Sequence, residues 1–358
     1  METIKLKING IEVTAPKGLT ILEAARLAHI EIPTLCFLKE INEIGACRVC
    51  IVELKNGKLV TSCVYPAEDG MEVFTNTPKV MDSRKKTIQL LLSNHNRSCL
   101  SCVRSGHCEL QELARELGVE DEGYYDGETT PSEIDTSAAH MIRDNSKCIL
   151  CRRCVAVCSE VQGIGVIGAN NRGFATEIGS AFGMGLGETS CVSCGQCIAV
   201  CPTGALQEKD CTSEVFAAIA DPSKHVIVQT APAVRAALGE EFGLPIGTNV
   251  EGKMAAALRR LGFDRVFDTD FSADLTIMEE AHEFLDRVKN GGVLPMITSC
   301  SPGWVKYCEH YFPDMTENLS TCKSPQQMFG AIAKSYYAEK MGIDPKDIVS
   351  VSVMPCTA

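Results

Sequence analysis

The sequence predicts a multidomain α+β and α/β protein in which several small cysteine-bearing domains precede one larger α/β domain. Three observations carry this prediction. Most of the twenty cysteines gather in separate groups before residue 211, and two of these groups have nearly the same spacing. Beyond that point strand-like apolar runs alternate with helix-like stretches, which is typical of a mostly parallel sheet. We therefore place domains at 1–78, 79–118, 138–211 and 222–358, with an acidic, turn-rich linker from residue 119.

Composition indicates a globular protein without an export signal. Hydrophobic residues make up 45% of the 358 positions and charged residues 22%, the usual balance of a globular chain. No apolar run approaches the length needed to cross a bilayer, and the N-terminus lacks a signal-peptide core, so we expect a cytoplasmic protein. In that reducing compartment, a count of twenty cysteines indicates metal ligands rather than disulfides. The net charge of −12 argues against a nucleic-acid partner.

The first domain opens with a predicted hairpin followed by a helix. Apolar residues alternate on both sides of Asn9-Gly10, which is a strong signal for a type I′ turn. Thr20 and Glu23 form a predicted capping box, and hairpin plus helix indicate a small β-grasp domain. Gly45 suits a backbone that folds tightly around sulfide. Four thiolates satisfy a [2Fe–2S] cluster, with zinc as the alternative, and the candidate ligands are Cys36, Cys47, Cys50 and Cys63.

The second domain places one histidine just ahead of three closely spaced cysteines. A neutral imidazole can replace a thiolate on iron, and this change of ligand shifts the potential of the cluster. Taken alone, the pattern also fits a zinc site with three cysteines and one histidine. Its position between two other iron–sulfur motifs favours a His-ligated [4Fe–4S] cluster. The candidate ligands are His95, Cys99, Cys102 and Cys108.

Residues 138–211 hold two nearly identical cysteine runs, each with the spacing C-x2-C-x2-C-x3-C. In two-cluster ferredoxins of this spacing, three close thiolates hold one [4Fe–4S] cube and the fourth reaches across to the other cube. Pro202 follows the second run as the pattern requires, whereas Ser159 follows the first. The expected ligands are Cys148, Cys151, Cys154 and Cys201 for one cube, and Cys191, Cys194, Cys197 and Cys158 for the other. We therefore expect a ferredoxin-like domain that moves electrons.

The last domain alternates predicted helices and strands. Helices are expected over 252–261 and 275–289, and the expected strands are 225–229, 265–267, 292–297 and 348–353. Ligands of such sheets bind beyond the carboxyl ends of the strands, and Cys300 and Cys356 follow two of the expected strands. Three thiols outside every motif are expected to be buried and free: Cys211, Cys308 and Cys322.

Four segments of this domain resemble characteristic motifs of the [FeFe]-hydrogenases. They are Thr298–Trp304 (TSCSPGW), Met354–Ala358 (MPCTA), Thr276–Ala281 and Lys323–Gln327. The resemblance covers the whole chain, because the large multi-cluster members of that family have the same domains in the same order. It implies that residues 222–358 are part of a hydrogenase catalytic domain. The active site implied is the H-cluster, in which a cysteine bridges a [4Fe–4S] cube to a di-iron unit carrying CO, cyanide and a dithiolate.

The resemblance assigns ligands of the active-site cube with one departure. Cys356 corresponds to a thiolate ligand of the cube. The first motif usually reads Thr-Ser-Cys-Cys-Pro, with a proton-shuttling cysteine before a ligating one. Here Cys300 keeps the first position and Ser301 stands in the second. Three alternatives stay open: Cys300 ligates the cube, Ser301 supplies an oxygen ligand, or the cube is impaired.

A proton path and a cofactor pocket are also implied by the resemblance. Hydrogen evolution consumes protons at a site sealed from water, so titratable or hydroxyl groups must connect that site to solvent. The implied path comprises Glu280, Glu283, Arg287 and Ser320. An acidic helix face is the alternative interpretation of the glutamates. The pocket around the di-iron unit would be formed by Pro232, Gln326 and Met354, and Ala233 stands where the best-known members have a hydrogen-bonding serine.

The resemblance implies a fragment of a longer catalytic subunit, because the chain ends at Ala358, before a lysine and a third motif that supplies two more ligands. We expect an NAD(P)H-linked hydrogenase that interconverts protons and H2, with NAD(P)H-oxidising flavin subunits, ferredoxin or both as partners. One alternative is a non-catalytic iron–sulfur subunit similar to that of NADH dehydrogenase, which is not expected to carry Thr298–Trp304. Another is a hydrogen-sensing relative, which fits the departures at Ser301 and Ala233.

Overall fold

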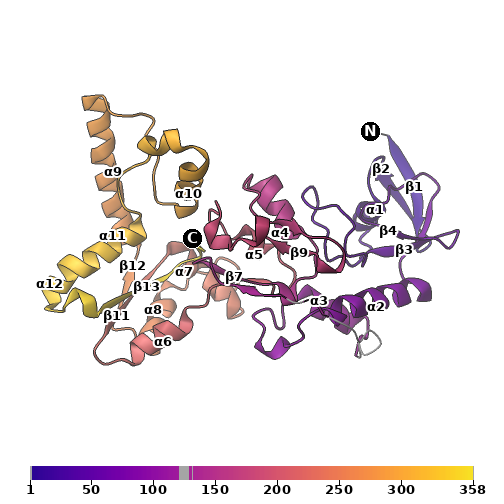
Figure 1. Ribbon diagram of the computed structural model, residues 1–358, viewed down its shortest axis with the longest axis horizontal. Helices are drawn as coiled ribbons and strands as arrows, with labels where there is room; N and C mark the ends of the chain where they lie inside the picture. Colours follow the sequence, from indigo (N-terminus) through magenta and orange to yellow (C-terminus); the bar gives the residue numbers. More distant parts are fainter. Residues whose placement is uncertain (1, 121–128, 131, 358) are drawn as a thin grey trace. The chain divides into compact units, whose positions relative to one another are not determined.

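The computed structural model describes residues 2–120, 129–130 and 132–357, so the acidic residues 121–128 of the predicted linker lie outside the described part. The chain divides into two compact units. Unit 1 comprises 1–191 and 195–208, and unit 2 comprises 192–194 and 209–358. Both units mix helices with strands (Figure 1). Within the described residues, no helix is long and apolar enough to cross a membrane.

Unit 1 begins with a five-stranded sheet in the order β2-β1-β5-β3-β4. Its strands are β1 (Thr3–Ile8), β2 (Ile11–Pro16), β3 (Ile51–Leu54), β4 (Leu59–Thr61) and β5 (Glu72–Phe74). The predicted turn is present, since Asn9 and Gly10 have φ of 51° and 82°, and type I′ needs positive φ at both. The predicted capping box is also present: the Glu23 N–H donates to Thr20 Oγ1 at 3.3 Å, and the Thr20 N–H donates to Glu23 Oε2 at 3.0 Å. It starts α1 (Ile21–Leu27), whose apolar face packs in the core of this sheet.

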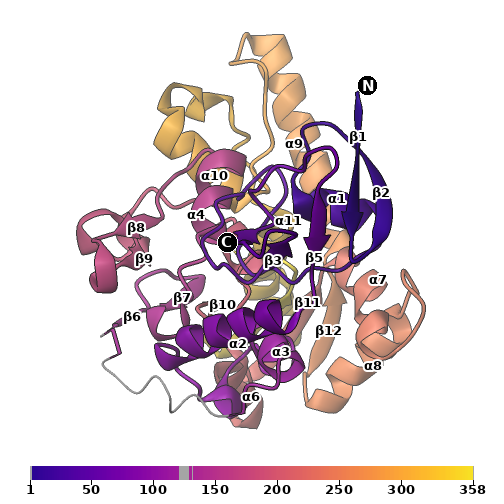
Figure 2. The same cartoon turned by 90° about the vertical axis from the view of Figure 1, so that its right-hand side faces the viewer.

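Two longer helices and two small sheets complete unit 1. Helix α2 (Pro78–Ser93) begins where the Thr77 side chain accepts from the Val80 N–H, and α3 (Glu109–Glu116) packs beside it (Figure 2). Short helices α4 (Arg153–Ala156) and α5 (Gln196–Ala199) each carry the third cysteine of a ferredoxin-type run. The small sheets have the orders β10-β7-β6 and β8-β9. Their strands are β6 (Ile134–Asp135), β7 (Met141–Asp144), β8 (Gly168–Asn170), β9 (Glu177–Gly179) and β10 (Leu206–Glu208).

Unit 2 contains a parallel sheet in the order β12-β11-β13. The strands are β11 (His225–Thr230), β12 (Arg265–Asp268) and β13 (Ile348–Val353). The central strand β11 is almost entirely buried and has the apolar run 226–228 at its centre, as expected for a parallel strand covered on both faces. The helices are α6 (Thr212–Ala220), α7 (Pro232–Glu241), α8 (Glu251–Leu261), α9 (Asp270–Asn290), α10 (Pro302–Tyr311), α11 (Pro325–Ile332) and α12 (Ala338–Met341).

The strand predicted over 292–297 is wrong. In the structure this segment has a single bridge, in which Ile297 pairs with Leu319, and residues 292–295 are exposed. A strand requires a neighbouring strand to complete its hydrogen bonds, and Pro295 has no N–H to donate. Cys300 therefore follows an irregular segment rather than a strand of the sheet. The two predicted helices of this domain are present, and α9 begins five residues before the predicted start at 275.

Candidate metal-cluster sites

The four cysteines of the first domain converge in its interior. All four are buried, and their thiols hydrogen-bond to one another. Hydrogen bonds from the Cys47 and Cys63 thiols lower the pKa of Cys36, and a hydrogen bond from Cys63 lowers the pKa of Cys50. The same contacts raise the pKa of Cys47 and Cys63. The four thiols therefore form one hydrogen-bonded group, as expected of side chains that ligate one compact cluster.

The backbone around the close cysteine pair is shaped for an anion. Gly45 and Arg48 have φ of 64° and 57°, and the Cys47 N–H donates to Cys36 Sγ at 3.5 Å. Successive N–H groups in alternating right- and left-handed conformations form concave anion sites, and many iron–sulfur sites use them. A Cβ at position 45 would lie 3.3 Å from Val64 Cγ2 in a left-handed conformation, so a side chain here would be strained. These residues fit a [2Fe–2S] cluster.

The histidine of the second domain is available as a neutral ligand. Burial, followed by the nearby Lys147, lowers the pKa of His95 to about 4, so the imidazole is uncharged near neutral pH. Its buried Nδ1 has no hydrogen-bond partner among the described residues. Such an orphaned nitrogen next to a cysteine triplet fits a metal ligand. Gly204 packs against a cysteine of the same motif, because a Cβ at position 204 would lie 2.6 Å from Cys102 Sγ.

The two ferredoxin-type runs repeat one backbone conformation. Leu150 and Arg152 have φ of 54° and 62°, and the corresponding Ser193 and Gly195 have φ of 60° and 70°. The Leu150 N–H donates to Cys148 Sγ at 3.4 Å. The internal repeat predicted from cysteine spacing therefore extends to the conformation of the loops, and each loop has the alternating geometry of an anion site.

The fourth cysteine of the second run shares a cavity with the first triplet. The cysteines lining this cavity are Cys148, Cys151, Cys154 and Cys201. Burial raises the pKa of the first two thiols to about 11 and about 12, and the charge on Cys201 adds to each rise. Cys158 packs in the same core as Cys191 and Cys197. In the described ranges, no three or more His, Cys, Asp or Glu side chains are arranged to hold a single metal ion. The assignment of clusters to these cysteines therefore rests on the shape of the loop backbone and on the cavities that the cysteines share.

Buried polar contacts tie the cluster loops of unit 1 together. Asn42, which is 3% exposed, donates through Nδ2 to the carbonyl oxygens of Cys36 at 2.7 Å and Cys151 at 3.0 Å. Arg153 forms a bidentate pair with Glu109 of α3, with N–O distances of 2.7 and 2.9 Å. Paired N–H···O contacts of this kind fix orientation as well as distance. The loops of three cluster sites are thereby held in one framework.

Replacing Asn42 with leucine should destabilise unit 1 by at least about 1–3 kcal/mol, because two buried carbonyl groups lose their donor. Urea unfolding followed through iron–sulfur absorption would measure the change. Asn56→Leu is the matched control, since Asn56 is exposed and its Oδ1 only accepts from the Lys58 N–H in a surface turn. Equal effects of the two substitutions would contradict a linking role for Asn42.

In unit 2 the predicted proton-path residues Glu283, Arg287 and Ser320 come together at α9. Ser320 Oγ donates to Glu283 Oε2 at 2.9 Å, and Arg287 Nη2 donates to Glu283 Oε1 at 2.6 Å. The Thr321 N–H also donates to the carboxylate. Burial raises the pKa of Glu283, but these hydrogen bonds outweigh burial, so its pKa is lowered overall. Glu280 lies half-buried three residues earlier on the same helix.

The predicted pocket residues gather where the parallel sheet ends. Pro232 begins α7 two residues after the end of β11, and Met354 directly follows β13. The side chain of Gln326 donates through Nε2 to Ser352 Oγ at 2.9 Å. The backbone carbonyl of Gln326 accepts from Gln229 Nε2 at 3.1 Å. The carboxyl ends of the strands are where ligands of such sheets bind.

The two motif cysteines of unit 2 are exposed. Cys300 Sγ lies 3.7 Å from Thr298 Oγ1, and Cys356 lies near the end of the described residues. Ser301 has a structural role, because its side chain accepts from the Trp304 N–H and begins α10. Serine is among the preferred residues for this helix cap. The Ser301 hydroxyl oxygen has two lone pairs and accepts one N–H here, so this cap is compatible with each of the three alternatives for the first motif.

The contact of Cys322 with the carboxylate of Glu283 in unit 2 was not predicted from the sequence. Of the three leftover cysteines, Cys308 is buried as expected, whereas Cys211 is exposed, so that prediction is wrong. Cys322 is half-buried with Sγ 3.7 Å from Glu283 Oε2, and burial followed by the negative charge of Glu283 raises its pKa. No local pattern signals this contact, because α9 and residue 322 meet only in the folded chain.

Sequence profiles of four domain families match the chain in order. They are a 2Fe-2S iron-sulfur cluster binding domain (1–78), the NADH-ubiquinone oxidoreductase-G iron-sulfur binding region (84–122), a 4Fe-4S dicluster domain (147–205) and the iron only hydrogenase large subunit, C-terminal domain (224–358). The profile of the NADH-dehydrogenase type matches the second domain, and NADH dehydrogenase [ubiquinone] iron-sulfur protein 1 of Solanum tuberosum is 36% identical over 181 residues, which is 50% of this chain and 24% of the relative. The hydrogenase profile matches residues 224–358, and an NADH-dehydrogenase-like subunit would not account for this part of the chain.

Individual proteins show the same relationship. NADP-reducing hydrogenase subunit HndD of Solidesulfovibrio fructosivorans is 53% identical over 370 residues, covering 100% of this chain and 63% of the relative. Iron hydrogenase 1 of Clostridium pasteurianum is 42% identical over 352 residues, covering 98% of this chain and 61% of the relative. A chain in the crystal structure of an NAD+-reducing [NiFe]-hydrogenase in the H2-reduced state has a TM-score of 0.54 and 31% identity, covering 57% of this chain and 87% of that chain.

Fold and sites together define a multidomain iron–sulfur protein with a hydrogenase domain behind its cluster-binding domains. Residues 224–358 belong to the family of the iron only hydrogenase large subunit, C-terminal domain, and the chain is similar over 98–100% of its length to the two hydrogenase relatives described above. It spans less than two thirds of the length of the two curated relatives described above, namely 63% and 61%.

Proposed function

We propose that this chain is the electron-delivering and part of the catalytic region of an [FeFe]-hydrogenase that interconverts protons and electrons with H2. The observation that carries the proposal is the combination, in one chain, of cluster-shaped cysteine loops with the hydrogen-bonded group Glu283, Arg287 and Ser320 in a hydrogenase domain. The domains of this proposal are 1–78, 79–118, 138–211 and 222–358, of which the first is a β-grasp domain.

Electrons would enter through the accessory clusters of unit 1. The proposed set is one [2Fe–2S] cluster and three [4Fe–4S] clusters, one of them ligated by His95. A neutral imidazole gives that cluster a different charge from its neighbours, and charge is one of the properties that set a cluster potential. Asn42 and the pair of Glu109 with Arg153 keep three cluster loops at fixed positions, which fixes the distances over which electrons move.

Protons would reach the catalytic domain through α9. The H-cluster, when bound, supplies the redox centre at which protons are reduced, and we propose Cys356 and Cys300 among the residues that hold it or serve it. Ser320 donates to the carboxylate of Glu283, and a hydroxyl can both accept and donate, so a proton can pass between them. Glu280 extends the path along α9, and Arg287 holds the Glu283 carboxylate in place. Pro232, Gln326 and Met354 would form the walls of the cofactor pocket.

Subunits that oxidise NAD(P)H through a flavin are the proposed electron partners, with ferredoxin as an additional or alternative donor. The NADP-reducing relative and the similarity to a chain of an NAD+-reducing hydrogenase support this choice. We propose a cytoplasmic location on the basis of the many cysteines, which stay reduced in that compartment.

An infrared spectrum tests the proposed function. The protein is produced with the hydrogenase maturation machinery and with the C-terminus that its organism encodes. Bands from iron-bound CO and cyanide are expected, because no other component of such a protein gives them. Their absence, with the accessory iron–sulfur signals present, would contradict catalysis.

An electron-wiring subunit without catalysis is the second candidate. It is favoured by one observation, the coverage of 87% of a chain from an NAD+-reducing [NiFe]-hydrogenase at a TM-score of 0.54. Normal electron transfer through unit 1 without hydrogen turnover would support this candidate.

A further inference from the structure

A buried arginine lies against the loop of the proposed [2Fe–2S] site. Arg84 on α2 is 5% exposed, and its Nη2 donates to the carbonyl oxygen of Ile51 at 2.7 Å. Ile51 directly follows Cys50, which is 1% exposed. The sequence does not suggest this contact, because Arg84 lies within a polar stretch of a helix. A buried cation therefore contacts the backbone of the residue that follows a buried candidate cluster ligand.

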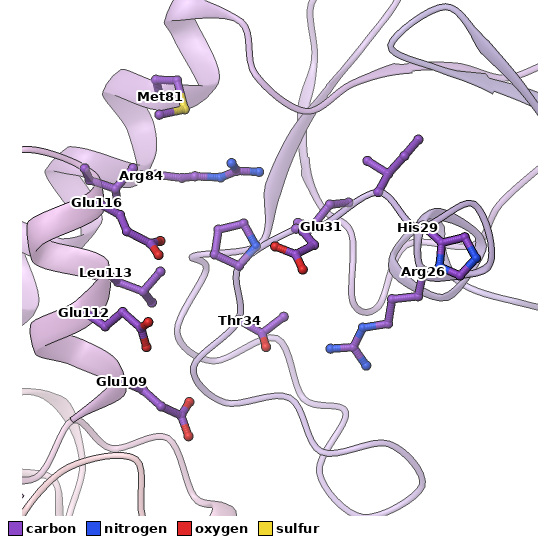
Figure 3. Close-up of a pocket in the computed structure, with 14 residues that line it drawn as sticks. Arg26, His29, Glu31, Thr34, Met81, Arg84, Glu109, Glu112, Leu113 and Glu116 are labelled. Carbon is purple, nitrogen blue, oxygen red and sulfur yellow. The ribbon is translucent and has the colours of Figure 1, made fainter. Parts of the chain in front are cut away.

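Among the residues that the structure describes, no carboxylate pairs with the guanidinium of Arg84. It lines a cavity of about 760 Å³ between α2, α3 and residues 26–34, and Figure 3 shows its side chain reaching from α2 into this space. Three glutamates on the cavity wall, Glu31, Glu112 and Glu116, are exposed, and among the described residues none of them forms an ion pair with Arg84. The Nε atom has no hydrogen-bond partner in the described part of the chain.

A buried charge without compensation is costly, so a countercharge is expected nearby. Burial lowers the pKa of Arg84 to about 10, and the charge of Cys50 opposes this shift. The guanidinium therefore stays charged near neutral pH. The proposed function supplies an anionic group on the loop that Arg84 contacts, namely the cluster itself, since sulfide and four thiolates outweigh the charge of two ferric ions.

We propose that the [2Fe–2S] cluster is the countercharge of Arg84, and that Arg84 raises the reduction potential of this cluster. The inference rests on the proposed [2Fe–2S] site. Reduction places one more electron, and so one more negative charge, on the cluster. A cation held at the cluster loop stabilises the reduced form more than the oxidised form, because its attraction grows with the negative charge of the cluster. Net charge and hydrogen bonding are among the properties that set cluster potentials.

Redox titration of the cluster-loaded full chain, followed by the electron paramagnetic resonance signal of the reduced [2Fe–2S] cluster, tests the proposal. Arg84→Gln removes the charge but keeps an N–H donor for the Ile51 carbonyl. We expect it to lower the equilibrium constant for reduction at least about tenfold, which is about 59 mV for a one-electron couple. Arg84→Lys keeps the charge and should retain most of the wild-type potential.

Lys85→Gln is the matched control. Lys85 follows Arg84 on α2 but is exposed, so solvent screens its charge and little change is expected. An unchanged potential in Arg84→Gln with an intact signal, or an equal shift in Lys85→Gln, would overturn the proposal. If Arg84→Gln does not retain the cluster, the Arg84→Lys variant decides. A cluster retained in Arg84→Lys at near the wild-type potential supports the requirement for a positive charge at position 84. Loss of the cluster in both variants overturns the proposal.

The same titration separates this proposal from the proposed cluster assignment. A wild-type protein without any [2Fe–2S] signal would contradict the cluster site itself. A wild-type signal whose potential does not respond to Arg84→Gln contradicts only the role of Arg84. The [4Fe–4S] signals of the same samples serve as an internal reference, because they are expected to shift less.

Discussion

Replacing Glu283 with glutamine is expected to reduce hydrogen turnover by about 10²- to 10⁴-fold, the usual contribution of a group that transfers protons in catalysis. Glutamine has the shape of glutamate but cannot accept and release a proton. Its oxygen can still accept from Ser320 or the Thr321 N–H, so the loop around residue 320 should stay in place. The loss is therefore expected in turnover and not in folding.

Hydrogen evolution with a chemical reductant, measured beside the iron–sulfur absorption, checks this expectation. Glu279→Gln is the control, because Glu279 is exposed on the same helix and its substitution removes the same charge. Turnover in Glu283→Gln that matches Glu279→Gln would show that these glutamates form only an acidic helix face. Ser320→Ala should reproduce much of the Glu283 defect, since Ser320 is the hydroxyl that contacts its carboxylate.

The stability of unit 2 should depend on pH through the same carboxylate. Burial raises the pKa of Glu283, yet the donors around it lower its folded-state pKa overall. A lowered folded-state pKa means that the stabilisation is fully present above the unfolded-state pKa of about 4.3, and that it is lost as pH falls through the folded-state value. Urea unfolding of wild type and Glu283→Gln should therefore converge on acidification.

The cluster loops were the most predictable part of the molecule. A compact cluster takes most of its ligands from one short loop, so Cys148, Cys151 and Cys154 must be close in sequence as well as in space. The turn at Asn9-Gly10 and the capping box at Thr20 were predictable for a similar reason. Each depends on a few neighbouring residues, and the structure contains both.

Features that depend on distant partners were not predictable. The apolar segment 292–297 has the composition of a strand, but it lacks a neighbouring strand in the described structure. Asn42 acts across 109 residues of sequence, and Arg84 across 33 residues, each through a backbone carbonyl. Every residue has such a carbonyl, so nothing in the local pattern indicates which one is contacted.

Cys201→Ala is expected to remove the cube of the first triplet, although Cys201 belongs to the second run. The reason is the cavity that Cys201 shares with Cys148, Cys151 and Cys154. Iron content should fall by one cube, and transfer of electrons from the accessory clusters to the catalytic domain should fall with it. Iron-to-protein ratios and the resonance signals of the reduced cubes measure both. Cys211→Ala is the control, because this thiol is exposed and outside every motif.

Double substitutions decide which cube Cys201 serves. If it ligates the first cube, Cys148→Ala combined with Cys201→Ala should lose no more iron than either single variant, because both changes remove the same cube. Cys191→Ala combined with Cys201→Ala should lose both cubes, since each change then removes a different one. The reverse pattern would place Cys201 with its own run. Non-additive losses of this kind arise when two residues serve one site, whereas independent sites add.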